Sequence, residues 1–291
     1  MSLKNNLDTL RHYHATYKNW LNVLKGVKNN NLPCEAILRA DSKKVLIFNR
    51  EQASLLSLGM EVDFDTEQQC LSFNYKGRKI FMHGADFDHG DIRGVFLNEN
   101  YKFLVKEGGT VVDVGANIGD SPVYFAANGM NVIAVEPYPS NAELALINAG
   151  KNGLADKIKV LNSAVGGVVA SVKVDSEVFP DKSSDLKQKE SGVEIPVLTL
   201  DAILKNYRLE EIFLKMDCEG CEYDSLLGSS DATILKFSKI AMEYHHGPER
   251  IVDKLENLGY HVDYTVPRNT KNSHAEAENF REGFLYASRT I

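Results

Sequence analysis

The chain has 291 residues, of which 43% are hydrophobic and 25% are charged, so it can bury a sizeable core and disorder is not expected. Its formal net charge of -7 argues against nonspecific nucleic-acid binding, which needs a basic surface. The sequence shows no apolar run near the roughly 20 residues that span a bilayer and no signal-peptide pattern at the N-terminus, so we expect a cytoplasmic protein without membrane contact.

The first third of the chain is predicted to be a small extension made of one helix and a few strands. Apolar residues at helical spacing between residues 3 and 27 indicate an amphipathic helix. A short strand is expected at 45–48, and alternation around Lys76-Gly77-Arg78 indicates a hairpin formed by 70–75 and 79–82. No motif in this part suggests a chemical role.

From Gly108 onward, short apolar runs alternate with helical patterns, which is typical of a parallel sheet covered by helices. The expected strands are 110–114, 131–135, 158–161, 211–216, 239–243, 261–264 and an antiparallel 283–288. The expected helices are 120–128, 140–151, 200–205, 223–227 and 249–258. We therefore predict two domains, an extension over 1–90 and a main α/β domain over 91–291.

The pattern is interrupted between Gly166 and Pro196. A strand is expected at 168–174, and the polar stretch 181–192 is read as a solvated surface loop, with a flap near the substrate as the alternative.

The loop 113–119, Asp-Val-Gly-Ala-Asn-Ile-Gly, follows a buried-type strand and precedes a helix. Glycines there let the backbone approach a ligand, and the helix N-terminus offers unpaired N–H groups. Glu136 ends the next strand about 20 residues later, the spacing at which a carboxylate accepts the two hydroxyls of a ribose. The loop therefore predicts a nucleoside-bearing cofactor.

The choice between a dinucleotide and S-adenosyl-L-methionine rests on two residues. Asn117 stands where the G-x-G-x-x-G fingerprint has the glycine that admits the pyrophosphate. Asp113 adds a carboxylate that suits a cationic amino-acid group better than a diphosphate. Both favour S-adenosyl-L-methionine over NAD.

Three motifs in order resemble one known family. Asp113-Val-Gly-Ala-Asn-Ile-Gly-Asp120 is similar to the first motif of the FkbM-type methyltransferases, and Val135-Glu136-Pro137 followed by Asn141 is similar to the second. Lys215-Met-Asp217-Cys-Glu219-Gly-Cys-Glu222 resembles their Lys-x-Asp-x-Glu-Gly-x-Glu motif. The resemblance runs from about residue 91 to 264. It implies a Rossmann-like class I methyltransferase fold, a seven-stranded, mostly parallel sheet whose last strand is antiparallel.

The resemblance also implies roles for single residues. Asp113, Gly115, Asn117 and Gly119 would line the methionine end of the cofactor, Glu136 would bind the ribose, and Tyr138, Ser163 and Ala164 would lie near the adenine. The full set expected to bind cofactor is Asp113, Gly115, Ala116, Asn117, Gly119, Glu136, Pro137, Tyr138, Ser163, Ala164 and Asp217. The implied reaction is methyl transfer to a hydroxyl of a small metabolite or sugar, with no nucleic acid as partner.

The catalytic residues are expected at the ends of the fourth and fifth strands. A hydroxyl acceptor has a high pKa, so a nearby base helps as its proton leaves. We predict His245 as that base, with Asp217 or Glu219 orienting the acceptor, although a polar loop after a strand explains His245 equally well. No metal is expected; Asp217, Glu243 and His245 are the alternative Mg²⁺ ligands.

Cys218 and Cys221 form a Cys-x-x-Cys inside the third motif. Cys34 and Cys70 do not complete a zinc site, and the context is not that of a thioredoxin, so packed thiols are expected.

Two other functions remain open at this point: a nicotinamide-dependent oxidoreductase, and a methyltransferase fold that only binds. Asn117 argues against the first, and the intact loop and Glu136 argue against the second. The sequence does not identify the acceptor, and it leaves a homo-oligomer possible.

Overall fold

The computed structural model describes residues 3–85, 91–174, 192–205, 207, 211–270 and 280–289. The chain divides into two compact units, Met1–Asn98 and Glu99–Ile291. The domain boundary predicted near residue 90 stays a prediction. No helix within the described ranges is long and apolar enough to cross a membrane.

The N-terminal unit begins with two helices where one was predicted. Helix α1 covers Leu3–Thr16 and α2 covers Trp20–Lys28. The break follows from the hairpin of β1 (Cys34–Ile37) and β2 (Lys44–Ile47), because the backbone N–H of Lys18 donates to Ile37 (2.7 Å). The side chain of Asn19 also accepts from the Ile37 N–H at 2.9 Å. Pairing with this strand takes the backbone groups that a continuous helix would have used.

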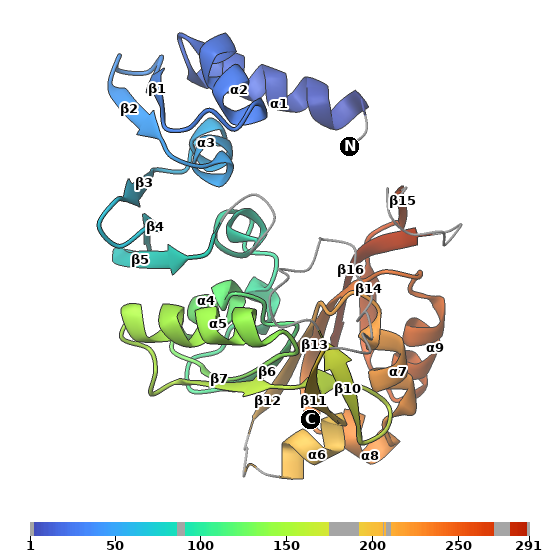
Figure 1. Ribbon diagram of the computed structural model, residues 1–291. Coiled ribbons are helices and arrows are strands. Elements are labelled where there is room, and N and C mark those ends of the chain that lie inside the picture. Colours follow the sequence, from blue (N-terminus) through green and yellow to red (C-terminus); the bar gives the residue numbers. More distant parts are fainter. Residues whose placement is uncertain are drawn as a thin grey trace. The chain divides into compact units, whose positions relative to one another are not determined.

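A third helix and a second sheet complete this unit (Figure 1). Helix α3 (Arg50–Ser57), which the sequence analysis missed, begins at the N-cap Asn49, whose side chain accepts from the Gln52 N–H. The antiparallel sheet has the order β3 (Val62–Asp65), β4 (Cys70–Tyr75) and β5 (Arg78–His83), which confirms the predicted hairpin. A π-helical turn follows over Arg93–Leu97.

The C-terminal unit contains the predicted mixed sheet. Its strands are β6 (Thr110–Val114), β7 (Asn131–Glu136), β8 (Ile158–Asn162), β12 (Ile212–Met216), β13 (Phe237–Tyr244), β14 (His261–Tyr264) and β16 (Phe280–Ser288). Their order is β14-β16-β13-β12-β6-β7-β8, and β15 (Arg268–Thr270) pairs with β16. Strand β16 is antiparallel to both β13 and β14, whereas the pairs from β13 through β12, β6 and β7 to β8 are parallel. This is the Rossmann-like class I methyltransferase arrangement that was expected.

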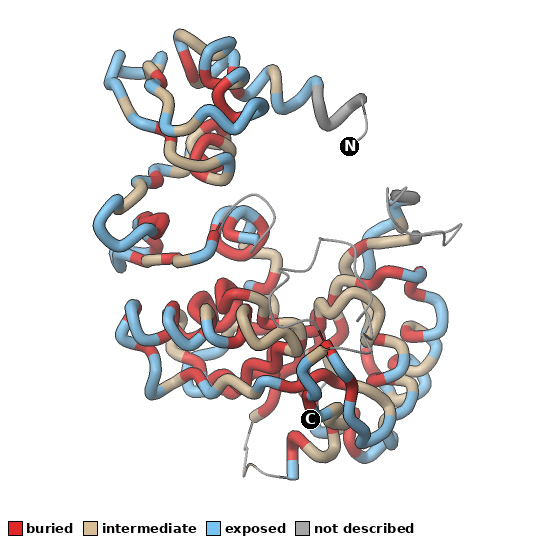
Figure 2. The backbone as a smooth tube through the Cα atoms, viewed as in Figure 1, coloured by how far each residue is buried: buried red, intermediate tan, exposed pale blue. Residues whose placement is uncertain are grey.

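The helices cover the two sides of this sheet (Figure 1). On one side lie α4 (Asp120–Ala127) and α5 (Pro139–Lys151); on the other lie α6 (Leu200–Lys205), α7 (Cys221–Gly228), α8 (Asp231–Ile234) and α9 (Glu249–Asn257). All five residues of β6 and all five of β12 are buried, as Figure 2 shows by the red tube at the centre of the unit. Burial on both faces explains why these strands are mostly apolar, with Asp113 and Lys215 as the charged exceptions.

A three-stranded sheet occupies part of the region where the sequence pattern was interrupted. Strand β10 (Ala170–Val174) pairs antiparallel with β11 (Val193–Leu198), which pairs parallel with β9 (Ala164–Val165). The strand expected at 168–174 is therefore present. Of the predicted loop 181–192, all but Gly192 lies outside the described residues.

Candidate active site

The β6–α4 loop is held in a shape that requires two glycines. Gly115 has φ +78°, and a Cβ added to it would lie 1.8 Å from the carbonyl oxygen of Asp217. Gly119 has φ +89°, and its added Cβ would lie 2.8 Å from the Cα of Ala145 in α5. The first glycine thus lets the loop touch the end of β12, and the second lets α4 approach α5.

A buried ion pair connects this loop to β12. The carboxylate of Asp113 is completely buried; it lies 2.9 Å from the Lys215 ammonium and accepts from the Ser121 hydroxyl at 2.7 Å. Lys215 also donates to the carbonyl of Gly115 at 2.7 Å. Burial alone lowers the pKa of Lys215, but the carboxylates of Asp113 and Asp217 outweigh burial and raise this pKa. Lys215 is therefore a cation that holds the β6–α4 loop against β12.

Glu136, at the end of β7, supports the same loop from the other side. Its two carboxylate oxygens accept the backbone N–H groups of Asn117 (2.8 Å) and Tyr138 (3.0 Å). Burial raises the pKa of Glu136 to about 7 despite these two hydrogen bonds. Each carboxylate oxygen still has a lone pair for a further donor, such as a ribose hydroxyl.

Two buried polar atoms beside Glu136 have no hydrogen-bond partner among the described residues. They are the hydroxyl of Ser163 and the amide oxygen of Asn141. Ser163 donates its backbone N–H to the Glu136 carbonyl, and the Asn141 amide group donates to the Asn117 side chain at 3.1 Å. Because buried polar groups are normally satisfied, these two atoms call for a partner such as water or a polar ligand.

The loop after β12 and the first turn of α7 carry a set of carboxylates. Glu222 is completely buried and accepts the backbone N–H groups of Cys218 (2.9 Å) and Gly220 (2.8 Å). Asp217 accepts from the Tyr101 hydroxyl at 3.2 Å. Glu219 lies between them in the sequence, with φ +56° and 38% of its side chain exposed. Glu219 is therefore a carboxylate that an acceptor can reach, unlike the buried Glu222.

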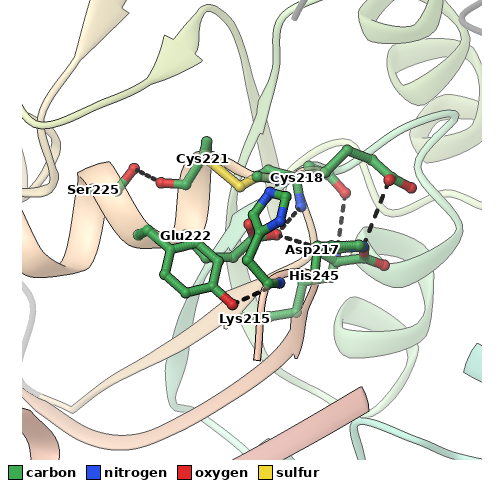
Figure 3. A network of polar contacts seen from close by, with 12 residues as sticks. Lys215, Asp217, Cys218, Cys221, Glu222, Ser225 and His245 are labelled. Carbon is green, nitrogen blue, oxygen red and sulfur yellow. Dashed lines mark hydrogen bonds and ion pairs between the residues drawn. A yellow bond between two sulfur atoms is a disulfide. The ribbon is translucent and has the colours of Figure 1, made fainter. Parts of the chain in front are cut away.

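His245, just past the end of β13, faces this loop (Figure 3). It is 3% exposed; its Nδ1 lies 3.2 Å from Glu222 and its Nε2 lies 3.6 Å from Glu219. Burial alone lowers the pKa of His245, but the carboxylates of Glu222, Glu219 and Asp217 outweigh it and raise the pKa to about 10. Near neutral pH the imidazole is therefore protonated.

The pKa values of the carboxylates near His245 are shifted in different directions. The pKa of Glu222 is below its ordinary value, because the hydrogen bonds from His245 and the backbone outweigh burial. Burial, opposed by His245, raises the pKa of Glu219 to about 7. Burial and the charge of Asp217 raise the pKa of Glu243 to about 8. The carboxyl groups of Glu219 and Glu243 therefore gain and lose protons near neutral pH, the range in which a general base works best.

Ligand atoms of Asp217, Glu219 and His245 all lie within 4.8 Å of one another, a spacing that could hold a divalent cation. This set contains Glu219 in place of the Glu243 that the sequence suggested. The protonated imidazole supplies one positive charge among these carboxylates.

Cys218 and Cys221 form a disulfide bond (Figure 3). The expectation of two packed thiols was therefore wrong. The sequence did contain the signal, because a Cys-x-x-Cys at the start of a helix brings the two side chains together.

The structure brings the predicted residues together in two groups. The first group surrounds the ends of β6, β7 and β8 and consists of loop 115–119, Glu136, Pro137, Tyr138, Ser163 and Ala164. The second group surrounds the ends of β12 and β13 and consists of Asp217, Glu219 and His245. Asp113 ends up inside the sheet with its carboxylate committed to Lys215 and Ser121. Sequence reasoning missed the role of Lys215, which reads as an interruption of an apolar strand.

Comparisons with known proteins agree with this geometry. The family model described as the methyltransferase FkbM domain matches residues 113–262, which is 150 of the 291 residues. No curated protein matches the chain.

Solved structures with a similar fold include a precorrin-6y C5,15-methyltransferase from Geobacter metallireducens GS-15, at 12% identity and a TM-score of 0.38, covering 66% of this chain and 87% of that one. An rRNA methylase from Streptococcus thermophilus has 9% identity and a TM-score of 0.41, and the match covers 68% of this chain and 96% of that one. A proposed tRNA (m1A22) methyltransferase from Streptococcus pneumoniae has 13% identity and a TM-score of 0.38, covering 66% and 68%.

The expectation that nucleic acid is excluded as a partner is corrected, because the similar structures include RNA methyltransferases; the small-molecule acceptor stays a prediction. Net charge is a sum over the whole chain and excludes no local basic surface. Residues 3–50 carry nine Lys or Arg and only three Asp or Glu, so the total of -7 hides a basic segment.

Proposed function

The chain belongs to the FkbM methyltransferase family, and we propose that it transfers a methyl group from S-adenosyl-L-methionine to a hydroxyl oxygen of its acceptor. The observation that carries the hydroxyl assignment is Glu219, a partly exposed carboxylate with a pKa raised to about 7, held 3.6 Å from a buried imidazolium. A hydroxyl must lose a proton as its oxygen is methylated, whereas an amine with a free lone pair needs no such base.

The residues at the ends of β6, β7 and β8 fit the nucleoside part of this donor. Glu136 has lone pairs left for two ribose hydroxyls, and Ser163 and Asn141 offer unpaired buried oxygens. We assign Gly115, Ala116, Asn117 and Gly119 to its methionine end and Pro137, Tyr138 and Ala164 to its adenine end. We assign Asp113 an indirect role: its carboxylate binds Lys215, and Lys215 holds the carbonyl of Gly115.

When bound, S-adenosyl-L-methionine supplies a methyl group on a positively charged sulfur, which departs with the bonding electron pair. The chain's own residues position the acceptor and exclude water, and positioning alone can lower the barrier by several kcal/mol. Contact between Gly115 and the backbone of Asp217 joins the two groups of site residues, so the acceptor and the donor are presented by one rigid edge of the sheet.

Proton removal is assigned to the Glu219–His245 pair. Ionised Glu219 takes the proton from the acceptor hydroxyl and becomes a neutral carboxylic acid. The acceptor oxygen keeps the electron pair of the O–H bond and is free to bond to the methyl carbon. His245, oriented through Nδ1 by Glu222, stays protonated and stabilises the ionised form of Glu219 beforehand. Asp217, held by the Tyr101 hydroxyl, is assigned to orienting the acceptor.

The proposal is tested by following labelled methyl from S-adenosyl-L-methionine into two acceptor pools, total RNA and an extract of small polar metabolites. We expect label that survives mild alkali, as an ether methyl does, and that drops at least about 100-fold in the Glu219→Gln variant. The matched control is Glu256→Gln on the exposed face of α9, which keeps full activity. Label released as methanol by alkali, or a fully active Glu219→Gln, would contradict the hydroxyl assignment.

The two rival functions give different results in the same assay. A nicotinamide-dependent oxidoreductase would bind NAD and transfer no label. A binding module would hold S-adenosylhomocysteine, the demethylated form of the donor, and transfer no label either.

A further inference from the structure

The disulfide between Cys218 and Cys221 closes a four-residue loop whose two inner residues are Glu219 and Gly220. The same loop supplies the backbone N–H groups of Cys218 and Gly220 that bind Glu222. Glu222 in turn orients His245. One covalent bond therefore constrains the carboxylate assigned to proton removal and the imidazole beside it (Figure 3).

The backbone inside this loop is in an unfavourable conformation. Glu219 has φ +56° and Gly220 has φ +121°, so two consecutive residues lie at positive φ. For Glu219, which has a Cβ, the left-handed region is unfavourable, whereas Gly220 adopts positive φ without strain, and the conformation of Glu219 persists only when surrounding bonds enforce it. The disulfide supplies that constraint, because it fixes the two ends of the strained segment.

The short span of the loop also says what the disulfide does not do. A disulfide stabilises a fold mainly by restricting the unfolded chain, and the gain grows with loop length. With only two residues between its cysteines, this bond contributes little of that kind. Its main effect is on the local shape of residues 218–221.

Both cysteines are partly exposed, so the bond is open to exchange with a thiol in solution. Cys221 is the first residue of α7, a position where a helix N-terminus favours a thiolate and makes a cysteine a good leaving group. The other cysteines, Cys34 and Cys70, lie in the N-terminal unit and form no disulfide.

We propose that Cys218 and Cys221 are a reversible modification site that takes a dithiol reductant and thereby switches the methyl-transfer site. The proposal rests on the proposed function, since it concerns the same Glu219. A thiolate of the reductant attacks one protein sulfur and releases the other as a thiolate; its second thiol then displaces the first protein sulfur. Two electrons and two protons pass to the protein, which becomes a dithiol, and the reductant leaves as a cyclic disulfide.

The disulfide form is the assembled one. Reduction leaves Glu219 free to relax from positive φ, so its carboxylate moves from His245, and the Cys218 and Gly220 N–H groups lose their fixed aim at Glu222. A displacement of about 1 Å in a reacting group can cost about 100-fold in rate. Glu136, Ser163 and Asn141 are not on this loop, and Gly115 meets only the backbone of Asp217 and Cys218, so donor binding changes less than methyl transfer does.

The test compares the purified full-length protein in the oxidised state and after treatment with dithiothreitol. Alkylation followed by mass spectrometry establishes which cysteines are thiols. We expect reduction to lower kcat about 10- to 100-fold, to change S-adenosylhomocysteine affinity less than about twofold, and to speed amide hydrogen exchange in the peptide spanning 217–222.

Two variants serve as partners. Cys218→Ser/Cys221→Ser should match the reduced protein and ignore dithiothreitol, whereas Cys34→Ser/Cys70→Ser should respond as the wild type does. Equal kcat in protein shown to be fully oxidised and fully reduced overturns the proposal, and this comparison stands even where the double serine variant fails to fold. Unchanged hydrogen exchange at 217–222 on reduction overturns it as well.

The hydrogen-exchange readout needs no methyl acceptor, so it separates the two proposals. No methyl transfer in either redox state refutes the proposed function, and the exchange rates of 217–222 still decide whether the disulfide controls the loop.

Discussion

Lys215→Met is the substitution from which we expect the largest loss of stability among the buried polar residues of the site. The ammonium is 3% exposed, and its partner Asp113 is 0% exposed. Methionine fits the same volume but removes the charge, so the Asp113 carboxylate stays buried with only the Ser121 hydroxyl to bind it. The carbonyl of Gly115 loses its donor at the same time.

The size of the effect follows from this geometry. Removing one partner of a buried ion pair typically costs about 3–5 kcal/mol, because the remaining charge is uncompensated. The total stability of a domain is about 5–15 kcal/mol, and each kcal/mol lowers the Tm of a domain of this size by about 2–4 °C. We therefore expect the Tm of Lys215→Met to fall by about 6–20 °C.

The assay is urea unfolding with thermal denaturation, and Lys239→Met is the matched control. Lys239 also donates to a backbone carbonyl, that of Phe103 at 2.9 Å. Its ammonium lies over the Phe103 ring, as that of Lys215 lies over the Tyr101 ring, but no buried carboxylate faces it among the described contacts. Its loss should cost about 1 kcal/mol. The double variant Lys215→Met/Asp113→Asn should recover part of the loss. Equal effects of Lys215→Met and Lys239→Met, or no recovery in the double variant, would refute the ion-pair reasoning.

Three further predictions use other parts of the site. Because Glu219 must be ionised and its pKa is raised to about 7, kcat/KM should fall as the pH drops below about 7; a flat profile from about pH 6 to about pH 8 would contradict the role of Glu219. Activity should survive EDTA, because His245 supplies the positive charge between Asp217 and Glu219; loss with EDTA and recovery with Mg²⁺ would assign those residues to a metal instead. Gly115→Ala should prevent folding or abolish donor binding, since its Cβ would meet the Asp217 carbonyl. The control Gly153→Ala, at φ +63° with open space around it, should cost only about 1–2 kcal/mol of stability. Equally mild effects of the two variants would show that the β6–α4 loop and the loop after β12 are not in contact.

The central strands β6, β7, β12 and β13 were predictable because they are buried almost throughout, whereas the outer strands β8 and β14 are partly exposed. β6 and β14 have the predicted bounds, and β7, β8, β12 and β13 differ from them by at most two residues at either end. The N-terminal unit was harder. Its first helix is broken at Lys18 by pairing with a strand distant in sequence, and no local pattern records that contact.

The candidate site was predictable as a set of motifs but not as an electrostatic arrangement. Glu136 and Asn117 were expected on the cofactor side, and they are joined by a hydrogen bond. The sequence assigned the base to His245 by its ordinary pKa, whereas three carboxylates brought together by folding raise that pKa to about 10. Such a shift depends on residues from two strand ends, so spacing along one strand cannot reveal it.

The central claim, that the ends of β6, β7 and β8 bind S-adenosyl-L-methionine, is tested most directly by titrating the protein with S-adenosylhomocysteine in a calorimeter. We predict one site per chain, binding weakened at least about tenfold by Glu136→Ala and unchanged by Glu143→Ala on the outer face of α5. Binding of NAD in place of S-adenosylhomocysteine, or equal affinity in the wild type and Glu136→Ala, would contradict the account.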